Sequence, residues 1–359
     1  MSKPNDPTSA PAGDVLDIRQ RKQDHLDLCA GDEVGFRGKT TLLEEVQLVH
    51  CALPEMHVDE IDSSVELLGK TLRAPVVISA MTGGTDEAER INKDLAQVAE
   101  ELGLAMGLGS QRAMHERPET ASTFAVRERA PNMLLFGNLG VVQAKAMSTA
   151  EIQDLVGAVG ADALCIHLNP AMEIVQPGGD RDFRGGLELL ARLVEGLDVP
   201  VIAKETGCGL SRAVGEQLVE VGIRHVDVSG AGGTSWVGVE AHRGDATQKA
   251  LAEELWDWGI PTGASVLQLR GLNLDIIATG GMRTGSDVVK AVALGATAGG
   301  LAAPVLKAHR AGGIDAARDF LEGVVRTVRA LMLLTGSRNV SELRRAPTRL
   351  GPRLRQWEV

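Results

Sequence analysis

The segment His167-Leu-Asn-Pro-Ala-Met-Glu173 brings chemically capable side chains together over a short stretch of chain. It places an imidazole, the carboxamide of Asn169 and a carboxylate directly after residues 163–166, an apolar run that is typical of a buried strand. Such groups at the end of a strand can bind a polar ligand or a cation, or move a proton. Met172 lies among them and offers only a polarizable thioether and apolar surface.

The carboxylate in this segment suggests a metal site. Glu173 could hold a hard cation together with Gln176 and Asp180, because Mg²⁺ usually takes one or two carboxylates and shares phosphate oxygens. Two plainer interpretations stay open: Glu173 is a helix-start carboxylate near the positive end of a helix dipole, and His167 is a satisfied core histidine. The position of His167 at a strand end beside Asn169 favours the functional interpretation.

Glycine-rich loops in the second half of the chain predict a phosphate site. Residues 229–235 and 280–285 each follow an apolar run, and the second loop leads into a helical segment. Glycine lets backbone N–H groups approach an anion, and a helix N-terminus favours negative charge. Tight turns also use glycine, but two such loops followed by the small residues Ala302 and Ala303 favour phosphate binding.

Basic side chains indicate further ligand contacts. Arg21-Lys22 and Arg112 are a candidate anion clamp, since arginine can bind a phosphate with two parallel hydrogen bonds. The alternative for Arg21-Lys22 is a solvated pair of charges near the terminus. Lys204 directly follows the buried run 201–203, so it could face an electron-rich cofactor or form a Schiff base.

These residues need a scaffold that brings strand ends together. Short apolar runs alternate with amphipathic helical segments from Pro75 onward, which is a βα repeat. Right-handed crossovers would close eight such strands into a (β/α)8 TIM barrel, an α/β fold, whereas an open doubly wound sheet is the alternative. Polar residues follow almost every strand, which favours the barrel. The expected strands are residues 75–79, 104–108, 133–136, 163–166, 200–203, 225–228, 275–278 and 297–301.

The remaining segments complete one barrel domain. Residues 1–13 are polar and proline-rich and predict a flexible terminus. Residues 14–359 are expected to form a single domain, with an N-terminal extension before the barrel and C-terminal closing helices within 312–346. The expected helices between strands are residues 91–102, 151–159, 187–197, 211–221, 247–258 and 286–294.

Composition excludes several classes of protein. With 359 residues, 44% of them hydrophobic, the chain can bury a sizeable core. The net charge of −11 argues against a broad nucleic-acid surface. No apolar run reaches the ~18–20 residues of a membrane span. The four cysteines show no metal-binding spacing and predict free thiols in a reducing cytoplasm.

The motifs together resemble those of the type 2 isopentenyl-diphosphate isomerases over about residues 21–340. No single motif is decisive, but their joint order is specific. The matching motifs are Arg21-Lys-x-x-His25, His50-x-Ala-Leu-Pro-Glu55, Met81-Thr-Gly-Gly84, Gly109-Ser-Gln-Arg112, Asn138-Leu-Gly140, His167-x-Asn169, Lys204-Glu205, Ser229-Gly-Ala-Gly-Gly-Thr-Ser-Trp236, Trp258-Gly-Ile-Pro-Thr262 and Gly280-Gly-x-Arg-Thr-Gly285.

This resemblance implies an FMN-dependent barrel enzyme that interconverts isopentenyl and dimethylallyl diphosphates by a proton shift across an allylic unit. It implies reduced FMN with NADPH as the reductant, Mg²⁺ on the diphosphate of the substrate, and a homotetramer or larger oligomer. His167 and Asn169 would be catalytic side chains of the substrate pocket, and Glu173 would bind Mg²⁺. Substrate contacts would come from Arg21, Lys22, Ser110, Gln111, Arg112 and Met172. FMN contacts would come from Met81, Thr82, Gly83, Ser110, Asn138, Lys204, Ser229, Thr234, Gly281, Met282, Arg283, Ala302 and Ala303.

One position departs from the pattern of the family in a way that bears on chemistry. Met172 stands where the family has a glutamine beside the reacting carbons, and segments 177–180 and 206–209 differ in smaller ways. Three interpretations follow: a working isomerase that relies on flavin and ordered water, a flavoenzyme acting on another prenyl or acyl substrate, or a protein that only binds flavin or prenyl diphosphate. The basic clamp and Glu173 favour the first.

Overall fold

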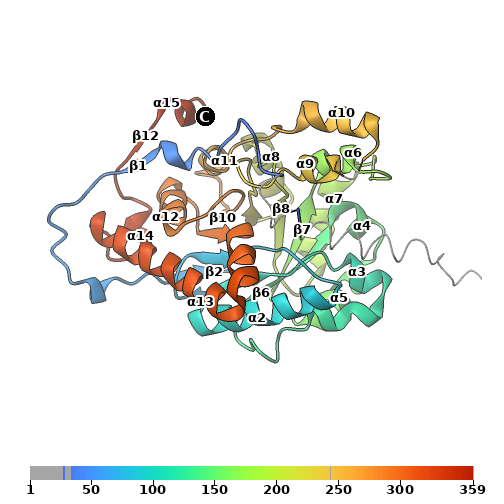
Figure 1. Ribbon diagram of the computed structural model, residues 1–359, viewed down its shortest axis with the longest axis horizontal. Helices are drawn as coiled ribbons and strands as arrows, with labels where there is room; N and C mark the ends of the chain where they lie inside the picture. The colour runs from blue at the N-terminus through green and yellow to red at the C-terminus, as the bar shows by residue number, and fades with distance from the viewer. Residues whose placement is uncertain (1–26, 29–33, 243, 359) are drawn as a thin grey trace, which may run out of the picture.

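The computed structural model describes residues 27–28, 34–242 and 244–358. Eight parallel strands form a closed barrel in which each strand pairs with the next along the chain, and β11 pairs with β4 (Figure 1). This confirms the predicted (β/α)8 barrel and rules out the open sheet. The barrel strands are β4 (Val76–Ile78), β5 (Ala105–Gly107), β6 (Leu134–Gly140), β7 (Ala163–Leu168), β8 (Val201–Glu205), β9 (His225–Asp227), β10 (Asp275–Ala278) and β11 (Ala298–Leu301).

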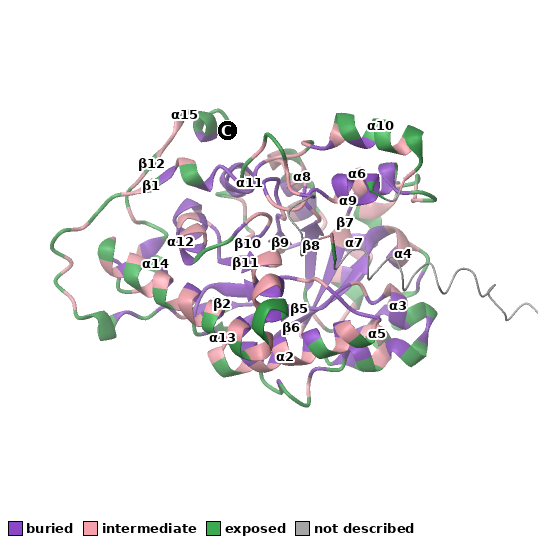
Figure 2. Cartoon of the chain, in the orientation of Figure 1, coloured by how far each residue is buried: buried purple, intermediate pink, exposed green. Residues whose placement is uncertain are grey.

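The wall of the barrel is buried on both sides. Every residue of β4, β5, β6, β8 and β11 is buried, and Figure 2 shows the strands enclosed by helices whose outer faces are exposed. Helices cover the outside of a closed parallel sheet and side chains fill its inside, so its strands are nearly continuous apolar runs. For this reason the strand positions follow closely from the sequence.

Helices of the outer layer begin where the sequence supplies caps. The Thr85 side chain caps α2, and Ser148 and Thr284 form capping boxes with Glu151 and Asp287. Each cap satisfies backbone N–H groups that have no partner within the helix. The outer helices are α2 (Asp86–Leu102), α5 (Thr149–Val159), α7 (Gly186–Gly196), α8 (Arg212–Glu220), α11 (Thr262–Leu269), α12 (Gly285–Leu294) and α13 (Ala303–Leu334).

Short helices occupy the loops that follow the strands. The predicted helix 247–258 corresponds to α10, which packs on α6 and α9 in these loops rather than in the outer layer. The outer place between β9 and β10 belongs to α11, which packs on α8 and α12. The sequence analysis missed α11 because nearly all of its residues are buried, so it has no amphipathic pattern. The loop helices are α3 (Arg112–Glu116), α4 (Val141–Lys145), α6 (Pro170–Val175), α9 (Trp236–Ala241) and α10 (Ala246–Leu255).

The C-terminal helices begin earlier than predicted. α13 starts at Ala303, directly after β11, and packs on α2 and α12 as the last helix of the barrel. It bends at Gly312 and Gly313, whose backbone angles are not helical. These two glycines made the segment before 312 look like a loop, because glycine is a poor helix former. The shorter α14 (Val340–Leu343) and α15 (Pro352–Arg355) follow.

The N-terminal extension is tied to the rest of the chain by two small sheets. β1 (Val46–Leu48) pairs with β12 (Thr348–Leu350), and β2 (Val65–Leu67) forms a hairpin with β3 (Lys70–Leu72) just before the barrel. The connecting 3-10 turns are η1 (Leu43–Glu45), η2 (Val58–Glu60) and η3 (Pro118–Phe124). None of the described helices has the length and apolar character needed to cross a membrane.

Candidate active site

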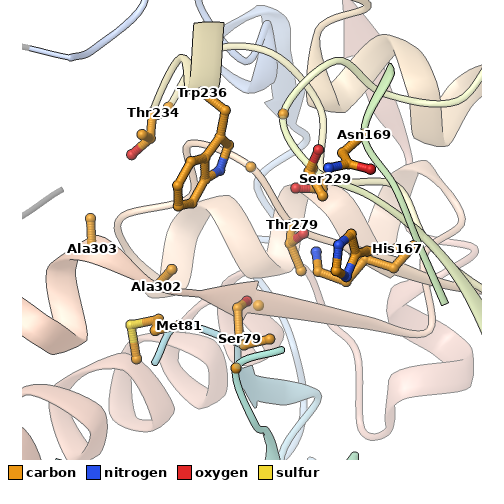
Figure 3. A pocket seen from close by; sticks show the side chains of 18 of the residues that line it. Ser79, Met81, His167, Asn169, Ser229, Thr234, Trp236, Thr279, Ala302 and Ala303 are labelled. Carbon is orange, nitrogen blue, oxygen red and sulfur yellow. The ribbon is translucent and has the colours of Figure 1, made fainter. Parts of the chain in front are cut away.

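A cavity of about 690 Å³ lies at the carboxyl ends of the barrel strands. This volume is within the range of small-molecule and cofactor sites, and this end of a (β/α)8 barrel carries the active site in the enzymes that share the fold. Figure 3 shows side chains from several strand ends pointing into the space. In order along the barrel, the lining includes Ser79, Ser110, Asn138, His167, Lys204, Ser229, Thr279 and Ala302.

A row of residues crosses four neighbouring strands near their carboxyl ends. Gly140, His167, Lys204 and Asp227 are aligned in register from β6 to β9. Side chains at one level of a barrel meet in a layer. The register therefore places an imidazole, an ammonium and a carboxylate side by side, although they come from separate strands.

The imidazole of His167 is neutral and its tautomer is fixed. Its Nδ1 lies 2.9 Å from Oδ1 of Asn138, whose amide nitrogen donates to Leu108 O at 3.1 Å. Because that amide is already oriented as a donor, Nδ1 carries the proton and Nε2 has the free lone pair. Burial, with a smaller effect from Lys204, lowers the pKa of His167 to about 4. At neutral pH His167 can therefore accept a hydrogen bond or a proton but carries no charge.

Glu173 lies in the wall beside His167 and is held at both oxygens. Asn169 Nδ2 donates to Oε1 at 2.8 Å, and the Asp180 N–H donates to Oε2 at 2.9 Å. A carboxylate has about four lone-pair sites, so both oxygens can still bind a cation. The second carboxylate, Asp180, accepts a hydrogen bond from Gln143 at 3.2 Å. This wall borders a smaller cavity of about 270 Å³, which Arg112, Gln143, Glu173, Gln176 and Asp180 line.

The donor set suits an ion that brings its own ligands. Among the residues that the structure describes, no group of three His, Cys, Asp or Glu side chains could enclose a metal. Mg²⁺ commonly binds through one or two carboxylates plus water and phosphate oxygens. Glu173 fits that pattern, and a complete cage of protein ligands is not needed.

The glycine-rich loops meet backbone to backbone on the other side of the cavity. A Cβ atom on Gly233 would lie 2.4 Å from Gly281 N, and one on Gly281 would lie 2.5 Å from Gly232 C. Gly281 also has a φ of +72°, which favours glycine. The first turn of α13 begins beside these loops at Ala303, which lines the cavity with Ala302. Close loops and a helix N-terminus together make a cradle for an anion, and this fits the phosphate of FMN.

Lys204 and its neighbour Glu205 are both buried at the end of β8. Lys204 Nζ donates to Asp227 Oδ2 at 2.9 Å and to the carbonyl oxygen of Glu205 at 3.1 Å. The Glu205 carboxylate turns away and accepts the N–H groups of residues 206–209. Burial raises the pKa of Glu205 to about 7, although these N–H groups lower it. Glu205 therefore shapes the loop after β8, while Lys204 faces the cavity.

The structure brings most of the predicted site residues together, and Gln111 is the exception. Its carboxamide accepts from Asn138 N–H at 3.0 Å and donates to Leu155 O at 2.9 Å, so it supports the wall from behind. Arg21 and Lys22 lie outside the described residues. The predicted residues that line the cavity are Met81, Thr82, Gly83, Ser110, Arg112, Asn138, His167, Asn169, Met172, Glu173, Lys204, Ser229, Thr234, Gly281, Met282, Arg283, Ala302 and Ala303.

Several residues at the site were missed by the sequence analysis. Asp227 lies within the run 225–228 and Thr279 directly follows the run 275–278. Both runs predict only strands, yet a charged residue in such a run is a signal in itself. Gln143 and Trp236 line the cavity from the first turns of α4 and α9. Residues in the first helical turn after a strand end can therefore line the cavity as the strand ends do.

A family model described as FMN-dependent dehydrogenase matches residues 17–173 and 180–349. Among solved structures, a mandelate oxidase variant with (S)-mandelic acid superimposes with a TM-score of 0.63 and 21% identity, covering 94% of this chain and 98% of that chain. A variant of the same oxidase that holds a monooxide FMN adduct also has a TM-score of 0.63, with 21% identity, 93% of this chain and 100% of that chain covered. Fold and family match thus define an FMN-dependent barrel enzyme.

Curated relatives narrow this class. An isopentenyl-diphosphate delta-isomerase of Pyrococcus furiosus is 44% identical over 347 residues, covering 94% of this chain and 88% of the relative. Those of Methanothermobacter thermautotrophicus and Nostoc are each 42% identical, covering 95% of this chain and 95% and 97% of the relatives. The chain belongs to the type 2 isopentenyl-diphosphate delta-isomerase family.

Proposed function

We propose that this protein isomerises isopentenyl diphosphate to dimethylallyl diphosphate by an allylic proton shift. The observation that carries the proposal is one cavity with two different walls. One wall offers the glycine-rich loops and the start of α13 for a phosphate, and the other offers His167, Asn169 and Glu173. A flavin and a prenyl diphosphate could lie against these walls together.

FMN is the cofactor that fits the first wall. Thr234, Gly281, Ala302 and Ala303 would hold its phosphate, and Met81, Thr82, Gly83, Ser110, Asn138, Lys204, Ser229, Met282 and Arg283 would contact the rest. Bound in its reduced form, with NADPH as the electron donor, FMN would supply a group that gains and loses a proton beside the substrate. Lys204 supplies a buried positive charge on this side of the cavity.

The second wall is proposed to bind the substrate. Ser110 and Arg112, with Gln111 behind them and the predicted Arg21 and Lys22, would hold the diphosphate. The Arg112 side chain is 39% exposed and paired with Glu116 at 2.6 Å, so it can turn toward an anion at small cost. Glu173 would hold Mg²⁺, and the ion would supply positive charge to balance the diphosphate.

The reacting part of the substrate would lie against the remaining residues of this wall. His167 Nε2 can accept a proton or a hydrogen bond, and Asn169 keeps the carboxylate of Glu173 in place. Met172 lines the same cavity with a thioether. This side chain suits an apolar prenyl tail but cannot relay a proton.

The thioether of Met172 also favours one second candidate. A flavoenzyme of the same scaffold acting on another prenyl or acyl substrate would need no proton relay at this position. The clamp and Glu173 would serve any prenyl diphosphate. A protein that only binds flavin or prenyl diphosphate is the outcome if neither reaction is found.

One anaerobic assay separates these functions. The protein is incubated with isopentenyl diphosphate, FMN, NADPH and Mg²⁺, and dimethylallyl diphosphate is measured. Product is expected, and its formation should need all four components. If flavin binds but no product forms, the isomerase proposal fails and the other prenyl substrates are tested. A homotetramer or larger assembly and a cytoplasmic location stay predictions, which light scattering and fractionation would check.

A further inference from the structure

We propose that Asp227, which lies below the cavity lining, is a positioning residue that fixes the Lys204 ammonium toward bound flavin. The inference rests on the FMN part of the proposed function. Asp227 belongs to none of the predicted sites and touches the cavity only through other side chains. It therefore acts through Lys204 and not on the substrate.

The ammonium protons of Lys204 fall into two that are bound by the protein and one that faces the cavity. An ammonium group has three protons. One goes to Asp227 at 2.9 Å and one to the carbonyl of Glu205 at 3.1 Å. Among the described residues no further acceptor takes the third, and Lys204 lines the cavity. Both partners of the ion pair are 8% exposed, so water contributes little to holding them.

Asp227 is itself held rigidly by its second oxygen. The Ser229 N–H donates to Oδ1 at 3.1 Å, and the Thr279 hydroxyl donates to the same atom. The carboxylate thus connects the ends of β8, β9 and β10. A carboxylate with both oxygens hydrogen-bonded cannot rotate freely. Its fixed position therefore restricts the position of the Lys204 ammonium.

The other groups around Lys204 cannot replace this carboxylate. On β7, His167 is neutral, and burial raises the pKa of the Cys165 thiol to about 12. On β8, the Glu205 carboxylate is turned toward the N–H groups of the following loop. On β10, Thr279 is uncharged. Among the described residues Asp227 is the only carboxylate paired with Lys204. An unpaired buried ammonium is costly, so without Asp227 the Lys204 ammonium would move away from its place beside the cavity.

The test compares reduced with oxidised flavin. Reduced flavin carries more negative charge than oxidised flavin, so a fixed ammonium favours it. Anaerobic titration of the flavin-free protein with oxidised and dithionite-reduced FMN gives the ratio of the two affinities without any substrate. In Asp227→Asn, which keeps the shape of the side chain, the ratio is expected to fall about tenfold at pH 8. For a two-electron couple this equals about 30 mV in reduction potential.

Lys204→Met should lower the ratio by a similar factor, and the double variant Lys204→Met/Asp227→Asn should be no worse than Lys204→Met alone. The matched control is Asp162→Asn, which breaks a lysine–aspartate pair at the opposite end of the barrel and should leave the ratio unchanged. Thr279→Val provides a milder change should Asp227→Asn fold poorly, and about a threefold drop is expected.

The outcomes for the role of Asp227 can be told apart from those for the proposed function. A ratio that is unchanged or higher in Asp227→Asn and Thr279→Val overturns the inference, since Lys204 would then need no partner. Additive losses in the double variant would show that Asp227 acts independently of Lys204, which also overturns it. Failure of the wild-type protein to bind FMN would remove both proposals. The affinity ratio could fall in the variants as expected while the wild-type protein shows no isomerase activity. That result would remove the proposed reaction and leave the inference on Asp227 standing.

Discussion

Lysine–aspartate pairs lie at both ends of the barrel, and they differ in what they leave free. At the amino end, Lys70 Nζ lies 2.7 Å from Asp162 and within 3.2 and 3.4 Å of the carbonyl oxygens of Asn132 and Met133. All three protons of this ammonium have acceptors. At the carboxyl end, Lys204 has two acceptors among the described residues and faces the cavity with the third proton.

The carboxylates differ in the same way. Asp162 accepts from Lys70, from Arg127 at 2.7 Å and from the Leu135 N–H at 2.9 Å, and it ties the β2–β3 hairpin to the start of the barrel. Asp227 holds Lys204 for a ligand. The same kind of ion pair therefore stabilises the fold where all three ammonium protons have acceptors in the protein. It serves a ligand where one ammonium proton remains available. This agrees with the division of a (β/α)8 barrel into a stability face and a functional face.

The largest expected effect is at the functional face. Glu173→Gln keeps the hydrogen bond to Asn169 possible but removes the charge that would hold Mg²⁺. We expect isomerase turnover to fall by about 10²-fold, because loss of even an outer-shell partner of a metal ligand costs ~10–100-fold and Glu173 would contact the metal directly. The Mg²⁺ dependence of turnover should shift to higher concentration, while the melting temperature stays close to that of the wild type. An unaltered Mg²⁺ profile would remove Glu173 from the metal site.

The stability face should respond in the opposite way. Asp162→Asn leaves Lys70 and Arg127 without a carboxylate, and we expect a loss of about 2 kcal/mol in the free energy of unfolding. The FMN affinity and the turnover of the folded protein should not change. Urea unfolding with a parallel flavin titration measures both. If Asp162→Asn alters flavin binding while stability holds, the contrast between the two faces is wrong.

The sequence predicts the residues that line the functional face better than the residues that lie behind them. Strand ends are visible because buried apolar runs stop at polar residues, and those residues converge once the barrel closes. The direction of a side chain is not visible in the same way. Gln111 looks like part of the anion clamp beside Ser110 and Arg112, yet its carboxamide bonds to Asn138 and Leu155 behind the wall.

Non-local pairing limits prediction of the fold in the same way. β1 and β12 are short, and they pair with each other from opposite ends of the chain. Neither therefore shows a strand pattern by itself. The charge of Asp227 is visible in the sequence, but its role could not be predicted for a related reason. It is one residue in an apolar run, and its role depends on Lys204 and Thr279, which only register brings next to it.

A smaller effect is expected inside the substrate wall. Met172→Gln restores a carboxamide that can donate and accept beside the reacting carbons of the proposed substrate. Turnover is expected to rise about tenfold, less than the ~10²-fold that a well-placed acid–base group supplies, since the surrounding wall now accommodates a thioether. Rates with isopentenyl diphosphate at saturating FMN measure it, and Met172→Leu serves as the control of similar size. A rate that is unchanged or lower would show that the methionine is not a simple loss.

The smallest expected effect is on the pH dependence of the free energy of unfolding, which should differ between the two faces. The pKa of His167 is about 4, against about 6.5 for an unfolded histidine, so between these values only the unfolded chain binds a proton. Stability should therefore fall as pH drops from about 6.5 to 4, by on the order of 1 kcal/mol because the ring is partly exposed to the cavity.

Asp162 acts in a lower window. Burial raises the pKa of its carboxyl, but the hydrogen bonds from Lys70, Leu135 and Arg127 outweigh this, and the net pKa is lowered. Its contribution is present above the unfolded pKa of about 3.9 and is lost as pH falls further. Urea unfolding from pH 7 to 3 should show a flatter slope above pH 4 in His167→Gln and a flatter slope only below pH 4 in Asp162→Asn. If both variants flatten the same window, the two faces do not titrate independently, and the functional end of the barrel is coupled to its base.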